Sequence, residues 1–228
     1  MIPIFVALDT PSYAIAEDLL YKLRDTVDIK IGLEFFIANG LESCRTIRNK
    51  GASRERKLFL DLKFHDIPNT VAGAVKSAME IEPDFLTIHC DGAEILEAAV
   101  AAADQAYAIG LKRPKLLGVT VLTSIGGDNP ITLDEQFANR INQSHIAGFD
   151  GIICPPSRIG FAKKCYPDMF LMVPGIRMEG SDSHDQKNIT TPKQAMDDGA
   201  DALVIGREIT KAEDPLKAVM AIKASMEA

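Results

Sequence analysis

The chain has 228 residues, a length that suits one large domain or two small ones, and 46% of them are hydrophobic, enough for a sizeable core. Its formal net charge of −7, with no basic tract, disfavours nucleic acid or an anionic membrane surface as a partner. The first residues have no basic segment, so they do not predict a signal peptide, and no apolar run is long enough to span a bilayer.

Short apolar segments alternate along the chain with segments whose apolar residues recur at helical spacing. Strands are predicted at residues 4–9, 29–32, 58–63, 85–90, 116–123, 151–155, 170–174 and 202–206. Helices are predicted at residues 13–23, 35–50, 71–81, 93–109, 133–147, 158–165, 192–198 and 215–226. This alternation predicts an α/β protein, a single-domain (β/α)8 TIM barrel over residues 1–228. A doubly wound open sheet is the alternative, but Asp9-Thr10-Pro11-Ser12 after the first strand contains no glycine.

Polar side chains gather where the predicted strands end, which is where a barrel carries its chemistry. Those residues are Asp9, Lys30, Asp61, Lys63, Thr123, Ser124, Arg177 and Arg207. Lys30 stands between two isoleucines, and a core-facing lysine is rare without a partner. The pattern predicts one end of the barrel lined with alternating acids and bases.

The segment 58–70 starts as a strand and then carries three charges in quick succession. Asp61 and Lys63 are two residues apart, so a strand points both side chains to one face. Asp66 follows at the turn before Pro68, which marks the start of a helix. These charges predict a paired network, because buried charges are costly unless they pair. The alternative is a solvated edge strand with Asp66 as a helix N-cap.

The turns after the seventh and eighth strands predict a phosphate site. Each contains a glycine, which lets backbone N–H groups approach an anion, and each contains an arginine, Arg177 or Arg207. Surface salt bridges are the alternative for these arginines. Residues 178–185 are polar and contain Gly and Ser, which predicts a flap closed by Gln186, or else a plain surface loop. Residues 125–130 have weaker features of a second flap.

Other chemistries have little support. The four histidines, His65, His89, His145 and His184, are far apart and lack metal-ligand spacing, so no metal site is predicted. We expect His89 to be a satisfied core residue or a support for the site residues, and not a metal ligand. Asp91 is expected to be either part of the site or a turn residue. The scattered cysteines, Cys44, Cys90, Cys154 and Cys165, predict free thiols in a reducing cytoplasm.

Several segments together resemble the orotidine 5′-phosphate decarboxylase family, in the right order along the whole chain. The most specific is Asp61-Leu62-Lys63-Phe64-His65-Asp66-Ile67-Pro68-Asn69-Thr70. The others are Val6-Ala7-Leu8-Asp9, Lys30-Ile31-Gly32, Gly118-Val119-Thr120-Val121-Leu122-Thr123-Ser124, Pro174-Gly175-Ile176-Arg177 with Asp185-Gln186, and Val204-Ile205-Gly206-Arg207. The resemblance implies a cytoplasmic homodimer of (β/α)8 barrels without metal or organic cofactor. It would convert orotidine 5′-monophosphate to uridine 5′-monophosphate and carbon dioxide, the last step of de novo pyrimidine synthesis.

The resemblance also implies roles for individual residues. Lys63 would protonate pyrimidine C6, Asp61 would lie beside the scissile carboxylate, and Lys30 would bridge the acids and the ribose. Asp66 and Thr70 would reach the neighbouring subunit's site. Further substrate contacts would be Asp9 at a ribose hydroxyl, Thr123 and Ser124 at the pyrimidine, Gln186 between base and phosphate, Arg177, Gly206 and Arg207 at the phosphate, and Ile67 and Pro174.

Three alternatives remain at this point. Magnesium-dependent 3-keto-gulonate-6-phosphate decarboxylases and hexulose-phosphate synthases share Asp-x-Lys-x-x-Asp, but they have a metal-binding Glu where this chain has Lys30. A Schiff-base aldolase would need a lysine of lowered pKa at Lys63, whereas Asp61 and Asp66 would raise it. A non-catalytic phosphate-binding barrel is the third.

Overall fold

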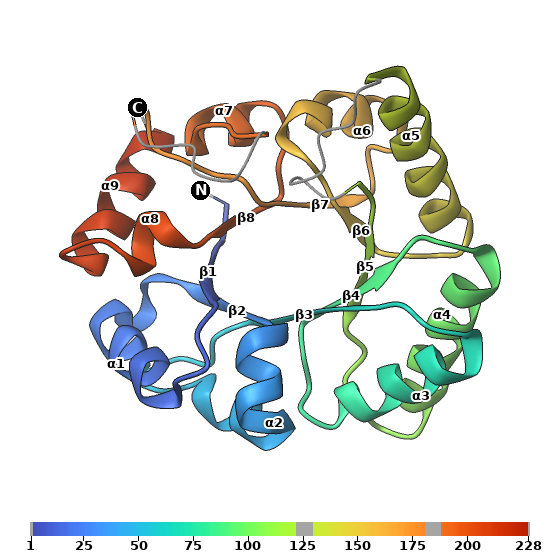
Figure 1. Cartoon of the computed structure of the whole chain (residues 1–228), viewed down its shortest axis with the longest axis horizontal. Coiled ribbons are helices and arrows are strands. Elements are labelled where there is room, and N and C mark those ends of the chain that lie inside the picture. Colours follow the sequence, from blue (N-terminus) through green and yellow to red (C-terminus); the bar gives the residue numbers. More distant parts are fainter. Residues whose placement is uncertain (1, 122–129, 181–187, 228) are drawn as a thin grey trace.

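The computed structural model describes residues 2–121, 130–180 and 188–227, the first three residues of the second range by their backbone alone. Within these ranges, parallel strands close into a barrel in the order β1 to β8, and helices form a ring around them (Figure 1). The strands are β1 Ile4–Leu8, β2 Asp28–Gly32, β3 Leu58–Phe64, β4 Phe85–His89, β5 Lys115–Val119, β6 Gly151–Ile153, β7 Phe170–Val173 and β8 Ala202–Ile205. The predicted (β/α)8 barrel is therefore confirmed.

The helices follow the strands as expected, with one addition. They are α1 Tyr13–Leu23, α2 Leu33–Ile47, α3 Pro68–Met79, α4 Ala93–Ala108, α5 Pro130–Ile146, α6 Ile159–Cys165, α7 Pro192–Asp197, α8 Arg207–Thr210 and α9 Pro215–Glu227, with short 3-10 turns at Arg24–Thr26 and Pro156–Arg158. The prediction missed α8, which is a single turn and too short to show helical periodicity. In the described residues, no helix is long and apolar enough to cross a membrane.

The end of the fifth strand was predicted wrongly. The prediction extended this strand to residue 123, whereas β5 ends at Val119. Thr120 already leaves the ladder, since its Oγ1 donates a hydrogen bond to the carbonyl of Ile153 (2.8 Å) and its own carbonyl accepts one from Arg140 (2.6 Å). An apolar run in the sequence does not reveal where such side-chain bonds replace strand pairing.

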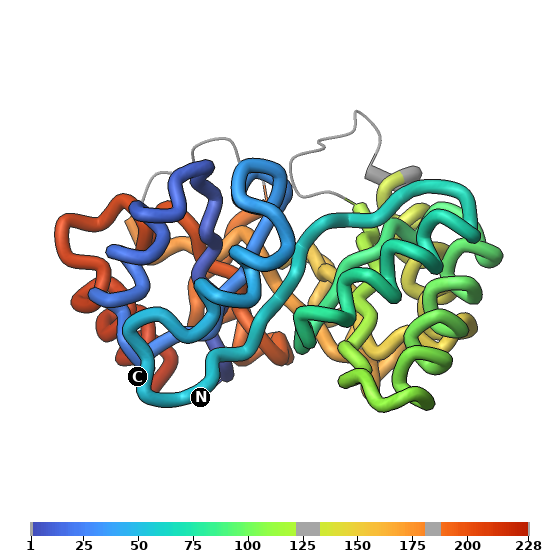
Figure 2. Tube along the Cα trace, turned by 90° about the horizontal axis from the view of Figure 1, so that it is seen from below, coloured from blue at the N-terminus to red at the C-terminus, as the bar shows by residue number. Residues whose placement is uncertain are grey.

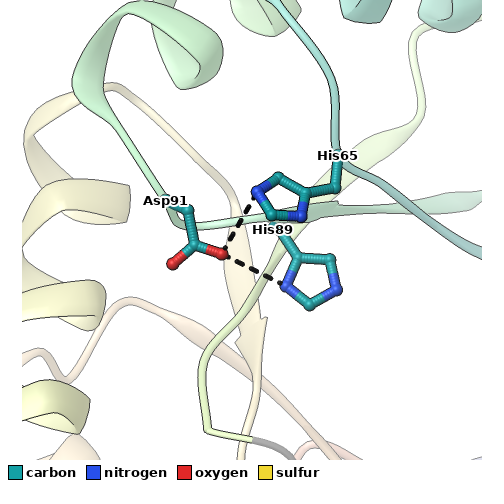
Figure 3. Close-up of side chains that lie close together, drawn as sticks. All are labelled: His65, His89 and Asp91. Carbon is teal, nitrogen blue, oxygen red and sulfur yellow. Dashed lines mark ion pairs between the residues drawn. The ribbon is translucent and has the colours of Figure 1, made fainter.

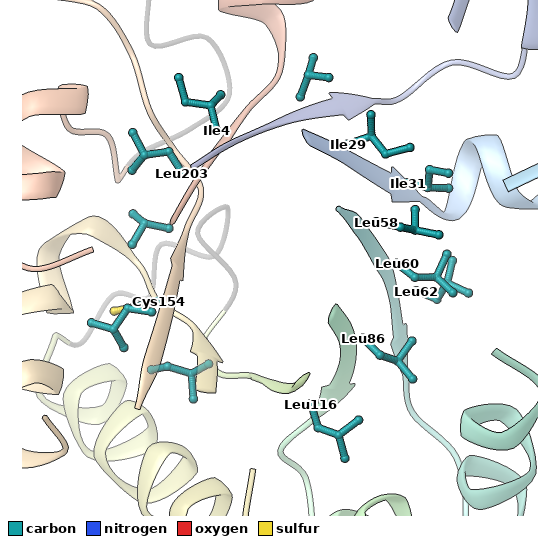
Figure 4. Packing of buried hydrophobic residues seen from close by; sticks show 14 of the residues in the cluster. Ile4, Ile29, Ile31, Leu58, Leu60, Leu62, Leu86, Leu116, Cys154 and Leu203 are labelled. Carbon is teal, nitrogen blue, oxygen red and sulfur yellow. The ribbon is translucent and has the colours of Figure 1, made fainter. Parts of the chain in front are cut away.

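Each strand has two apolar faces, because one faces the helices and the other faces the barrel interior. The outward face packs against the helices and includes Ile29 and Ile31 on β2 and Leu58, Leu60 and Leu62 on β3 (Figure 4). The inward face forms a second cluster that fills the barrel, made of Phe5, Phe59, Phe85, Leu117, Met172 and Ala202. Charged side chains on the next inward positions therefore lie above a filled layer rather than in a pore.

The amino ends of the strands are joined by a repeated contact that the sequence does not predict. A carboxylate just before or at the start of each even-numbered strand accepts the backbone N–H of a residue just before or at the start of a neighbouring odd-numbered strand. The four pairs are Asp28 with Lys57 (3.0 Å), Asp84 with Leu58 (2.7 Å), Asp150 with Leu116 (2.9 Å) and Asp201 with Leu171 (2.7 Å). Both chain termini lie at this lower end of the barrel in Figure 2, so the other end is left for the site.

Candidate functional site

A row of alternating charges crosses the carboxyl ends of β1, β2 and β3. Lys30 Nζ lies 2.7 Å from Asp9 Oδ1 and 3.9 Å from Asp61 Oδ2. Asp61 Oδ2 in turn accepts a hydrogen bond from Lys63 Nζ at 2.6 Å. The side chains of Lys30 and Asp61 are only 8% and 13% exposed, so each needs the opposite charges beside it to offset its desolvation cost. The predicted network of acids and bases is therefore present.

Gly32 makes room for this row at the end of β2. A Cβ atom at this position would lie 2.9 Å from Asp9 Oδ1 and 3.1 Å from Lys30 Nζ. The first of these distances is too short for any real Cβ contact, so a larger residue would displace the Asp9–Lys30 pair. The Lys30-Ile31-Gly32 motif thus combines a charge with the space that the charge needs.

Lys63 owes its position to an irregularity in β3. Its φ of 50° lies in the left-handed region, which is strained for a residue with a long side chain. The register between β3 and β4 shifts between Leu60 and Phe64, which marks a bulge at Asp61 and Lys63. Bulges re-aim side chains, and here Asp61 and Lys63 both line the same pocket.

Thr87, the third residue of β4, holds this bulge in place. Its Oγ1 accepts the backbone N–H of Lys63 (2.9 Å) and donates to Asp61 Oδ1 (3.1 Å). The residue is fully buried. Thr87 was not among the predicted site residues, because a threonine inside an apolar strand gives no signal of the partner that it meets on the next strand.

The row of charges borders a cavity of about 500 Å³ at the barrel mouth. Aliphatic side chains, among them Val119, Val121, Ile153 and Val204, form part of its lining. A pocket with an apolar floor and a few convergent charges suits a flat organic ring that carries a polar group.

The turns after β7 and β8 supply cations on another part of the same cavity. Gly175 has a φ of 79°, which glycine adopts without strain. Arg177 is 5% exposed, and its Nη1 donates to the carbonyl of Ile176 at 2.7 Å. Arg207 and Lys211, at the two ends of the short helix α8, also line the cavity. Lys211 was not predicted, since a lysine after a helix too short to be recognised resembles any surface lysine.

Eight of the predicted site residues line this cavity: Asp9, Lys30, Asp61, Lys63, Pro174, Arg177, Gly206 and Arg207. Three others, Asp66, Ile67 and Thr70, do not line it and are exposed. Asp66 is not the N-cap of α3 either, because the cap residue is Ile67, whose backbone N–H donates to Asp66 Oδ1 at 2.7 Å. Thr123, Ser124 and Gln186, with both predicted flaps, lie outside the described residues apart from 130 and 178–180.

The sequence predicts His89, at the end of β4, to be a satisfied residue and leaves the role of Asp91 open; neither residue lines the cavity. Asp91 Oδ1 accepts a hydrogen bond from Arg140 at 2.6 Å. Burial lowers the pKa of His89, and the nearby His65 lowers it further, so the neutral imidazole is favoured.

The fold and this cavity define a class of protein: a (β/α)8-barrel enzyme with a row of paired charges facing arginines across its mouth. The sequence profile described as "Orotidine 5′-phosphate decarboxylase / HUMPS family" matches residues 3–222. The chain belongs to this family.

Individual relatives agree with the profile. A protein of Rhodospirillum rubrum named orotidine 5′-phosphate decarboxylase is 43% identical over 230 residues, which cover 96% of this chain and 92% of the relative. A protein of the same name from Moorella thermoacetica is 39% identical over 235 residues, covering 98% and 92%. The crystal structure of orotidine 5′-phosphate decarboxylase from Lactobacillus acidophilus has a TM-score of 0.83 and 33% identity and covers 100% of both chains.

Proposed function

We propose that this protein decarboxylates orotidine 5′-monophosphate to uridine 5′-monophosphate and carbon dioxide, the last step of de novo pyrimidine synthesis. The observation that carries the proposal is the row Asp9–Lys30–Asp61–Lys63, which shares one cavity with Arg177 and Arg207. A row of fixed charges suits the reacting end of such a substrate, and two arginines suit its phosphate. The names of the relatives support the same substrate.

Lys63 and Asp61 are the proposed reacting groups. The bond between pyrimidine C6 and the carboxylate breaks, its electron pair stays on C6, and carbon dioxide leaves. Lys63 Nζ, held 2.6 Å from Asp61 Oδ2, then gives a proton to C6 and regains one from water. No carbonyl is placed to absorb this charge as an ordinary enolate, so a preorganised ammonium is the stabilising group that the chain provides.

The remaining cavity residues bind the parts of the nucleotide that do not react. Asp9 and Lys30 take the ribose hydroxyls, and Arg177, Arg207 and the Gly206 backbone take the phosphate. Binding energy from these remote contacts orders the site around the reacting carbon. Thr123 and Ser124 are proposed at the pyrimidine edge and Gln186 between base and phosphate, on the resemblance of their motifs.

A homodimer is part of the proposal. Asp66 and Thr70 are exposed outside the cavity of their own chain, which is consistent with a place in a neighbour's site. Ile67 between them is 65% exposed, and Leu33 and Ile37 on α2 are exposed as well. Large apolar side chains on consecutive β/α units are typical of a surface that another subunit covers.

Cys44, Cys90, Cys154 and Cys165 are all free thiols, in keeping with a proposed location in the cytoplasm.

The alternatives fit this site less well. A magnesium ion would need a carboxylate at position 30. This chain has the Lys30 ammonium there instead, and Lys30 already binds Asp9 at 2.7 Å. A Schiff base at Lys63 would have to break the ion pair that its amine makes with Asp61 at 2.6 Å. A binding protein without catalysis has no need for Lys63 in a strained backbone conformation.

The test is uridine 5′-monophosphate formation from orotidine 5′-monophosphate, followed by its absorbance change, in buffer with excess EDTA. We expect turnover that the chelator does not change. Turnover lost in EDTA and restored by magnesium would favour the metal-dependent enzymes of the same family. Nucleotide binding without release of carbon dioxide would show a binding protein and contradict the proposal.

A further inference from the structure

Three potential metal ligands meet at the carboxyl ends of β3 and β4, beside the cavity and not in it. His65 directly follows β3, His89 is the last residue of β4, and Asp91 follows two residues later. Parallel neighbouring strands bring these ends side by side, and both imidazoles face the same carboxylate (Figure 3). One ligand atom from each residue lies within 4.8 Å of the other two.

The distances between the imidazole nitrogens and the carboxylate oxygen are longer than hydrogen bonds and close to the distances between two ligand atoms of one metal ion. His65 Nε2 is 3.5 Å and His89 Nδ1 is 3.6 Å from the same oxygen, Asp91 Oδ2. A protein N–H···O hydrogen bond is about 2.7–3.2 Å long. Two ligand atoms that each lie about 2.1 Å from one ion at a tetrahedral angle are about 3.4 Å apart. The two separations from the imidazole nitrogens to Asp91 Oδ2 thus match two edges of one face of a coordination tetrahedron, and the two nitrogens lie within 4.8 Å of each other.

The surroundings of the three residues fit the same interpretation. Arg140 Nη2 binds the other oxygen, Asp91 Oδ1, at 2.6 Å, and its Nη1 is fixed on the carbonyl of Thr120. A partner of this kind orients a ligating carboxylate and leaves its second oxygen for the ion. A hollow of about 580 Å³, lined in part by His65, Ile67 and Asp91, leaves room for water at a fourth position. It borders the surface that the proposed second subunit covers.

We propose that His65, His89 and Asp91 bind one divalent transition-metal ion of the zinc class per chain. Two imidazoles and one carboxylate select such ions over magnesium or calcium, which prefer oxygen ligands alone. The ion takes no part in the proposed decarboxylation. It would join the end of β3, two residues after Lys63, to the end of β4, two residues after Thr87. The site stands on its own geometry and is independent of the substrate proposed above.

The experiment titrates the metal-free full-length protein with Co²⁺, followed by visible absorbance, and with Zn²⁺, followed by calorimetry. A Cys165→Ser background removes the one exposed thiol, which is a competing ligand. We expect one ion per chain and Co²⁺ absorption bands of a four- or five-coordinate site. His65→Ala, His89→Ala and Asp91→Asn should each weaken binding at least about tenfold. His145→Ala, which removes an exposed histidine of α5, is the matched control and should bind as the background does.

Thermal melting separates ligand loss from misfolding. In EDTA, the Asp91→Asn and His65→Ala variants should melt close to the background protein. Zinc should raise the melting temperature of the background and of His145→Ala, because a ligand that binds only the folded state stabilises it, and should not raise it in the three ligand variants. Absence of saturable uptake by the background protein would overturn the site. Equal loss of binding in His145→Ala and His89→Ala would overturn it too.

Discussion

At the scale of single residues, Lys63 has a strained backbone conformation, and its side chain is the proposed proton donor. We expect Lys63→Ala to lower the rate of uridine 5′-monophosphate formation by at least about 10³-fold, because both the proton and the stabilising charge are lost. Circular dichroism and the melting temperature should stay near normal. Lys57→Ala is the control, since Lys57 is exposed at the opposite end of the same strand. A Lys63→Ala enzyme within tenfold of the parent would refute the assigned donor.

Thr87 is the positioning residue behind that donor. Thr87→Val keeps the shape but leaves the Lys63 N–H and Asp61 Oδ1 without their partner. We expect kcat to fall about 10–100-fold, because small misplacements of reacting groups are costly, with little change in KM. Thr87→Ser, which keeps the hydroxyl, should restore most of the rate.

Thr120→Val is the matched control for Thr87→Val. Thr120 is also buried and also loses one hydrogen bond, to the carbonyl of Ile153, but it does not contact Asp61 or Lys63. Both valine variants should lose stability, by about 1–3 kcal/mol where a buried group is left unsatisfied. If Thr120→Val lowered kcat as much as Thr87→Val, the positioning role would be wrong.

The pKa values of the cysteine thiols predict which of them react at pH 8. Burial raises the pKa of Cys44 to about 12 and that of Cys90 to about 11, and it raises the pKa of Cys154 as well. A raised pKa leaves little thiolate at pH 8, and only the thiolate reacts. In the native protein at pH 8, Ellman's reagent should therefore titrate Cys165 quickly, and Cys165→Ser should show no fast thiol. All four should react in denaturant, and two or more fast native thiols would contradict this burial.

The sequence predicts Asp61 and Lys63 because strand alternation and motif spacing are local. It does not predict Thr87, Lys211 or the meeting of His65 with His89. Thr87 and the contact of His65 with His89 depend on a neighbouring strand. Lys211 follows a helical turn that is too short to show a hydrophobic period. The pairing of Lys30 is an intermediate case: its burial predicts some partner, but only the barrel identifies Asp9 and Asp61.

At the scale of elements, the carboxylates at the amino ends of the strands are expected to contribute stability and not catalysis. Asp84 Oδ2 accepts the Leu58 N–H at 2.7 Å and pairs with buried Arg48 at 2.6 Å. Asp84→Ala should lower the free energy of unfolding by about 2–4 kcal/mol, since it leaves a buried N–H and part of a buried guanidinium unpaired. Its kcat should stay normal, because this end lies opposite Lys63.

Asp197→Ala provides the comparison for Asp84→Ala in urea denaturation. Among the described residues, the Asp197 carboxylate pairs with Lys193 alone, at 3.6 Å and largely exposed, and such pairs contribute about 0–1 kcal/mol. A similar loss of stability in both variants would mean that the contacts at the amino ends contribute no more to the free energy of unfolding than an exposed ion pair does. The helix and strand periods predict all the main elements, but they do not reveal these contacts, because an aspartate before a strand looks like any turn residue.

At the scale of the whole molecule, the proposed catalytic residues and the stabilising carboxylates lie at opposite ends of the barrel. Paired charges with a reactive geometry lie at the carboxyl ends of the strands, and backbone-binding carboxylates lie at the amino ends. The alternation of eight strands with helices predicts the site at the carboxyl ends without any knowledge of the substrate, but it does not predict the carboxylates at the amino ends. Alternation within one chain does not predict which exposed residues would serve the site of the proposed second subunit, because nothing local distinguishes Asp66 from a solvated turn residue.

Subunit mixing tests the proposed dimer and the role of Asp66 together. If each site combines Lys63 of one subunit with Asp66 of its neighbour, Lys63→Ala and Asp66→Ala homodimers should both be inactive. A hybrid dimer then contains one site with both defects and one intact site. Random mixing makes about half of the dimers hybrid in a two-fold assembly, so about a quarter of the parent activity should return. Differently tagged subunits that copurify as hybrids without any recovered activity would show that Asp66 does not serve a neighbour's site.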